Sequence, residues 1–210
     1  MNVLENLATS LNRRDEVPNT ELAVKISKKN DNSSVKVLVE NLYQKNKNIA
    51  HDCIKVLYEI GERKPALIEP YITEFISLLE SKNNRMQWGA MHALDAIAAE
   101  NKKTIYSVLT KIIDAADKGT VITRDHAVAI LIKLCSDGKY AGNAFKLLIE
   151  QLKKCPTNQL PMYAENSMSI ITEKNKSLFI KTLENRFDEL EKDSQRKRLE
   201  KVFKKITSSR

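Results

Sequence analysis

Three histidines are the residues of this chain whose chemistry best suits catalysis or metal binding: His51, His92 and His126. His51 and His126 each have an aspartate beside them in the sequence, but adjacent residues of a helix point in different directions. The sequence also lacks an HExxH zinc motif and a glycine-rich phosphate loop. Because catalysis needs several groups that converge on one point, we expect no catalytic residue, no metal, no cofactor and no small-molecule substrate.

The cysteines and the N-terminal residues bear on the compartment. Cys53, Cys135 and Cys155 lie far apart in the sequence and show no metal-type spacing. Such a set is typical of reduced thiols in a cytosolic protein. The first residues carry an early glutamate and no apolar run, and no apolar stretch is long enough to span a membrane. We therefore expect a cytoplasmic protein without a membrane-spanning segment.

A repeat of 37 residues organises the elements that must position these side chains. Leu57, Leu94 and Leu131 occupy the same place in segments 49–61, 86–98 and 123–135, and a fourth copy spans 160–172. Apolar residues within each copy recur at steps of three, four and seven, which predicts an amphipathic helix. A second stripe, through Val35, Ile72 and Leu109, keeps the same period. Each repeat is therefore predicted to be a helix pair.

In each repeat the leucine stripe lies on the second helix of the pair. That helix resembles the HEAT repeat motif, Val-Arg-x-x-Ala-Ala-x-Ala-Leu-Gly-x-Ile-Gly. Residues 86–98 match it best, with Ala90, Ala93, Leu94 and Ile97 in place. The arginine that forms part of the family's inter-repeat ladder is present only at Arg124. The resemblance covers roughly residues 30–175 and implies an all-α protein, a right-handed α–α superhelix (solenoid) of about five HEAT-like helix pairs.

The period also predicts the domain organisation. We expect residues 1–210 to form a single HEAT-like repeat domain. Residues 1–30 are expected to form a degenerate N-terminal cap and residues 176–210 a C-terminal capping pair, because the ends of a solenoid need a polar outer face. The predicted repeats between them are 31–63, 64–100, 101–138 and 139–175.

The resemblance implies a non-enzymatic scaffold that binds a protein or peptide on the concave face formed by the second helices. If the stripe through Leu94 faces the core, Trp88, His92 and Asp95 lie on the opposite, exposed side. Equivalent positions in neighbouring repeats complete one strip with aromatic, aliphatic and polar groups, a composition typical of protein interfaces. An alternative is that Trp88 packs against the neighbouring repeat. The predicted strip contains His51, Lys55, Tyr58, Trp88, His92, Asp95, Asp125, Ile132, Met162 and Asn166.

Nucleic acid is the alternative partner. The chain has a net charge of +8, and most of the excess lies in residues 174–210. Arg196, Lys197 and Arg198 make the densest basic run and are the candidate anion-binding residues. A run of this kind is also typical of a solvated capping helix. The enzymes among HEAT-like proteins are the weakest alternative, because the iron-binding His-Glu dipeptides are absent and Trp88 is the only tryptophan.

Overall fold

The computed structural model describes residues 2–208, in which all regular structure is helical and comprises twelve α-helices with short 3₁₀ segments. The chain divides into two compact units, Met1–Ala127 and Val128–Arg210. The predicted single domain over residues 1–210 therefore stays a prediction. Residues 1, 209 and 210, which that domain includes, lie outside the described part of the chain.

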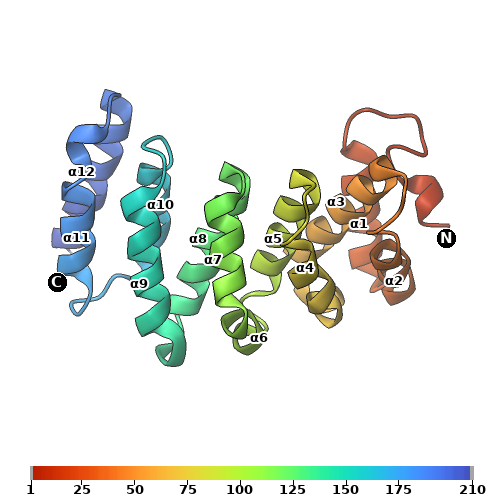
Figure 1. Cartoon of the computed structure of the whole chain (residues 1–210), viewed down its shortest axis with the longest axis horizontal. Coiled ribbons are helices and arrows are strands. Elements are labelled where there is room, and N and C mark those ends of the chain that lie inside the picture. The colour runs from red at the N-terminus through yellow and green to blue at the C-terminus, as the bar shows by residue number, and fades with distance from the viewer. Residues whose placement is uncertain (1, 209–210) are drawn as a thin grey trace. The chain divides into compact units, whose positions relative to one another are not determined.

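The first unit builds two layers of helices. In one layer α3 packs between α1 and α5, and in the other α2 packs on α3 and α4 on α5 (Figure 1). The α-helices of this unit are α1 (Val17–Lys29), α2 (Asn32–Glu40), α3 (Lys47–Arg63), α4 (Ile72–Leu78), α5 (Asn84–Ile97), α6 (Lys102–Ser107) and α7 (Leu109–Lys118). Helix α8 (Val121–Cys135) begins in this unit and ends in the next.

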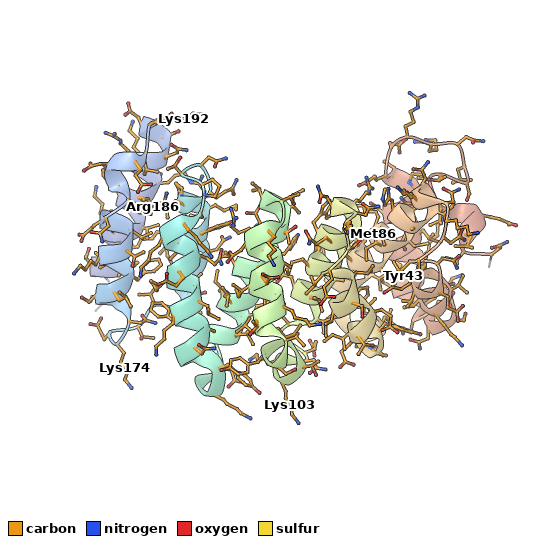
Figure 2. All side chains as sticks on the ribbon, in the orientation of Figure 1. Tyr43, Met86, Lys103, Lys174, Arg186 and Lys192 are labelled. Atoms are coloured by element: carbon orange, nitrogen blue, oxygen red, sulfur yellow. The ribbon has the colours of Figure 1, made fainter. Side chains whose placement is uncertain are left out.

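The second unit repeats the same construction. Helix α11 packs on α9, and α12 packs on α10. Its α-helices are α9 (Gly138–Lys154), α10 (Leu160–Ser167), α11 (Lys176–Glu184) and α12 (Asp193–Ser208). Arg186, labelled in Figure 2, is buried in this unit and donates to the carbonyl oxygens of Leu152 and Cys155 at 2.9 and 2.7 Å. It thereby satisfies carbonyl groups at the C-terminus of α9 that have no helical partner.

Polar residues cap the N-termini of several helices in the first unit, and two of these caps are separated by the repeat period. Asp31 caps α2, because its carboxylate accepts from the Ser34 N–H at 3.0 Å. Hydrogen bonds from the Ser33 and Ser34 hydroxyls lower the pKa of Asp31 to about 2. Asn46 and Asn83, spaced like the leucines, cap α3 and α5. These two asparagines thus mark where α3 and α5 begin.

The core follows the predicted stripes. Leu57, Leu94 and Leu131 are all fully buried, as the leucine stripe predicts, and the bounds of the repeats stay a prediction. Helices α3 and α5 approach very closely at Gly89. A Cβ atom at this position would lie 2.7 Å from Cγ1 of Ile54. Gly89 therefore lets the neighbouring second helices α3 and α5 pack closely.

The first elements of two repeats differ from the continuous helices that the sequence predicts. In repeat 64–100, α4 is preceded by two 3₁₀ helices, η2 (Pro65–Leu67) and η3 (Glu69–Tyr71). Pro70 has no N–H to donate, which excludes a regular α-helical turn around it. In repeat 101–138 the first element is divided at Val108 into α6 and α7. The first part of each of these repeats is therefore a succession of short helical segments rather than one continuous helix.

Candidate interaction surface on the second helices

A stack of four rings crosses helices α3, α5 and α8 within the first unit. The Tyr58 ring of α3 lies between two rings of α5, with centroids 5.7 Å from Trp88 and 4.2 Å from His92. His92 in turn stacks on His126 of α8, at 3.9 Å and an interplanar angle of 21°. We call these four residues the ring stack. It joins side chains from three consecutive repeats. Three of its members, Tyr58, Trp88 and His92, belong to the predicted strip.

Each histidine of the chain also bonds to the neighbouring repeat. His92 Nε2 lies 2.6 Å from Glu62 Oε1, and His126 Nδ1 lies 2.9 Å from Asp95 Oδ2. His51 Nε2 lies 2.7 Å from Asn83 Nδ2. A set of histidine contacts thus bridges neighbouring repeats.

Burial sets the protonation of two of these histidines. Burial lowers the pKa of His92, the neighbouring His126 lowers it further, and the Glu62 carboxylate opposes the shift. The pKa of His51 is lowered by burial and by the charge of Arg85. Both imidazoles are therefore held in the neutral form at neutral pH.

A group of paired charges lies at the Trp88 end of the ring stack. The Lys55 ammonium lies 4.8 Å from the Tyr58 ring centroid, and the Arg85 guanidinium lies 5.9 Å from that of Trp88. Glu16, from the start of α1, forms ion pairs with both cations. Lys55 also bonds to Glu59 at 2.6 Å. Burial opposes the charge of Lys55, but its hydrogen bonds to Glu59 and Tyr58 raise its pKa, so the ammonium stays charged.

Accessibility divides this surface into a floor and a rim. The side chains of Lys55 and Glu59 are each only 12% exposed. Glu16 and Arg85 are 42% and 34% exposed, and Trp88 is half-buried. The expectation that Tyr58 and Asp95 lie exposed on the strip is wrong, because both are buried. Rings from α5 cover Tyr58, and His126 bonds to the carboxylate of Asp95.

The remaining members of the predicted strip lie apart from the ring stack. Asp125 is half-buried on α8, and its sequence neighbour His126 is the residue that reaches α5. Ile132 and Met162 are half-buried and Asn166 is exposed. These three belong to the second unit, and their membership of one strip with Trp88 stays a prediction.

The basic triplet of α12 is partly engaged within its own unit. Arg196 Nε donates to the Leu190 carbonyl oxygen at 2.8 Å. Arg198 forms a two-bond pair with Glu165, at 2.8 and 2.5 Å. Lys197 is exposed. Two of the three candidate anion-binding side chains thus already have acceptors, and their role toward nucleic acid stays a prediction.

Four residues of this surface lie outside the predicted strip: Glu16, Glu62, Arg85 and His126. The pairs Glu62–His92 and Asp95–His126 are separated by 30 and 31 residues, slightly less than one repeat. A search for carboxylates at that separation from each histidine would have found both pairs. Nothing in the sequence links Glu16 to Arg85, because the two are 69 residues apart and meet only through tertiary packing.

Other features of the described residues place limits on this surface. Residues 2–208 contain no group of three or more histidine, cysteine or acidic side chains arranged to hold a metal ion. Within the same part of the chain, none of the helices has the length and apolar character needed to cross a bilayer.

A cavity of about 260 Å³ adjoins Arg85 and is mostly polar. A second cavity, of about 320 Å³, lies at the turns beside Tyr43 and Met86 (both labelled in Figure 2) and does not include the ring stack.

Sequence comparison gives one partial relative. No family model matches the chain. The uncharacterised protein MJ0078 of Methanocaldococcus jannaschii is 32% identical over 124 residues, which are 56% of this chain. The match spans 60% of that relative, less than two thirds of its length.

Solved structures give a likeness over almost the whole chain. A designed armadillo repeat protein in complex with the peptide (KR)4 has a TM-score of 0.63 at 12% identity, covering 98% of this chain and all of its own. Armadillo repeat proteins designed computationally for modular peptide recognition give 0.59 at 13% identity, covering 96% of this chain and 97% of theirs. An engineered protein gives 0.62 at 19% identity, with both chains fully covered. The fold of this chain is therefore a HEAT/armadillo-like helical repeat.

Proposed function

We propose that this protein is a non-enzymatic scaffold that binds a protein or peptide segment on the inner face of α3 and α5. The observation that carries the proposal is the half-exposed Trp88, which rests on the buried Tyr58 ring and lies beside Arg85. An aromatic residue supported from below and surrounded by polar groups is typical of the residues that dominate binding energy at protein interfaces. The armadillo proteins of similar fold that bind or were designed to recognise peptides support the same function. A cytoplasmic location is part of the proposal and rests on the three free cysteines.

The rim can hold an extended segment by polar contacts as well. Lys55 and Glu59 on α3 are paired with each other, so the floor is already neutralised. The more exposed Arg85 and Glu62 leave groups of both signs accessible above it. A partner would therefore meet an aromatic centre with a polar rim, the usual organisation of a protein interface.

Selection from a displayed library of random peptides tests the proposal. Peptides captured by the wild-type chain should lose about tenfold or more in affinity for Trp88→Ala, because central aromatic residues contribute about 2 kcal/mol or more. Tyr43→Ala is the matched control, since Tyr43 is 64% exposed on the same unit and lies outside the ring stack. Circular dichroism of both variants should show unchanged helicity.

Two results would contradict the proposal. One is that selected peptides bind the Trp88→Ala and Tyr43→Ala variants equally well. The other is that oligonucleotides bind more tightly than any peptide, with a steep salt dependence that flattens when Arg196, Lys197 and Arg198 are neutralised. That second result would favour the nucleic-acid alternative.

A further inference from the structure

Glu16 occupies an unusual position at the start of α1. It is the N-cap residue of that helix, but its side chain makes no capping hydrogen bond. Its two carboxylate oxygens instead face Arg85 and Lys55 on two other helices. An N-cap carboxylate normally accepts from the first turn of its own helix. This one bridges the two cations that flank the ring stack.

The segment that carries Glu16 is held at both ends by one buried residue. Asp52 of α3 accepts from the Thr9 N–H at 2.7 Å and from Asn19 Nδ2 of α1 at 2.8 Å. Residues 10–18 lie between these two anchors, and most of them are exposed. Glu16 can therefore leave the cations without loss of the Asp52 contacts.

The Arg85 guanidinium borders a cavity and has one nitrogen without a hydrogen-bond acceptor in the described part of the chain. Its Nε atom is buried and has no hydrogen-bond acceptor within the described residues. The cavity of about 260 Å³ beside it is also lined by Arg14, Asn48 and His51. A carboxylate entering from this cavity would meet the terminal nitrogens of Arg85, one of which now pairs with Glu16.

We propose that Arg85 and Lys55 form a pocket for an acidic side chain of the bound peptide, and that Glu16 is a built-in competitor that fills this pocket in the free protein. The proposal rests on peptide binding to the Trp88 surface and adds the chemistry of the partner. Binding then exchanges one carboxylate for another. In the free protein Glu16 pairs with both cations. A partner therefore gains binding free energy only when its carboxylate binds Arg85 and Lys55 more favourably than Glu16 does.

The charges around the pocket favour a peptide carboxylate over a polyphosphate chain. Asp15 and Asp52 line the cavity beside Arg85, and Glu59 and Glu62 lie further along α3. A single carboxylate reaches Arg85 between these acids, whereas a nucleic-acid backbone would bring further negative charges against them. The expected partner is thus a peptide with an isolated acidic residue.

Peptide pools that differ at one position test the exchange. Each pool has random flanking residues without tryptophan and a fixed central Glu, Gln or Lys, so that Trp88 fluorescence reports binding. The wild-type chain should bind the Glu pool more tightly than the Gln and Lys pools. Glu16→Gln should tighten binding of the Glu pool by about tenfold, because it removes the competing charge. Arg85→Ala should abolish the preference for Glu.

Controls separate this inference from the proposed function. Glu40→Gln makes the same charge change at an exposed position of α2 and should leave all affinities unchanged. If the pools bind without preference for Glu, or if Glu16→Gln acts like Glu40→Gln, the pocket is refuted while peptide binding stands. If no pool binds even to Glu16→Gln, both proposals fail. Arg85-dependent binding of a single-stranded oligonucleotide above that of the Glu pool would also refute the pocket.

Discussion

Replacing Gly89 with alanine tests how closely α3 and α5, the two helices that carry the interaction surface, pack against each other. A Cβ atom at Gly89 would lie 2.7 Å from Cγ1 and 3.3 Å from Cγ2 of Ile54, both well inside ordinary contact distance. Neither atom is the free end of a flexible chain, so the helices must shift or Ile54 must leave its rotamer. Overpacking of this kind costs about 1–3 kcal/mol.

The opposing contribution comes from the backbone. Alanine is favoured over glycine within a helix by about 0.8–1.0 kcal/mol. The net effect of Gly89→Ala on the free energy of unfolding should therefore lie between no change and a loss of about 2 kcal/mol. Gly142→Ala is the matched control, because Gly142 lies within α9 and a Cβ there would meet no atom within 4 Å. That variant should gain close to the full backbone contribution.

A double-mutant cycle measures the steric contribution directly. Ile54→Ala removes both close atoms and leaves the Ile54 Cβ at 3.6 Å, an ordinary contact. Chemical denaturation of the two single variants and the double variant should give a coupling free energy of about 1–3 kcal/mol, with the double variant more stable than additivity predicts. A Gly89→Ala variant stabilised as much as Gly142→Ala, with no coupling to Ile54, would refute the close approach of α3 and α5.

Three further outcomes follow from burial and hydrogen bonding. Leu94→Ala should lower the free energy of unfolding by about 2–5 kcal/mol, because Leu94 is fully buried; a loss below about 0.5 kcal/mol, typical of surface positions, would contradict the repeat alignment. Stability should fall as the pH drops below about 6.5, since burial and His126 lower the pKa of folded His92 and the unfolded chain takes up the proton first. His92→Gln should flatten that slope in urea titrations at several pH values, and an identical slope in the variant would exclude His92 as its source. Arg186→Met should destabilise the second unit by about 1–3 kcal/mol, because two buried carbonyl oxygens lose their donor; thermal unfolding identical to that of the wild-type chain would contradict this role.

The sequence alone determined the repeating architecture, because packing of each second helix depends on local periodicity. Leucines spaced by one repeat, such as Leu57 and Leu94, must lie at equivalent places once each segment is helical. The cap at Asp31 was predictable for the same reason, since its hydrogen bond to Ser34 is formed within one turn. The presence of Tyr58, Trp88 and His92 on one inner face also follows from helical spacing and the period.

Only the tertiary structure decided which of these side chains are accessible and how they are paired. Exposure depends on the reach of side chains from neighbouring repeats, so Tyr58 and Asp95 are covered by α5 and α8 although their own helices place them on the inner face. The pairing of Glu16 with Arg85 depends on how the N-terminal segment folds back over α3. Helical periodicity defines the face on which a residue lies, but contacts between residues far apart in the sequence depend on the distance between packed helices.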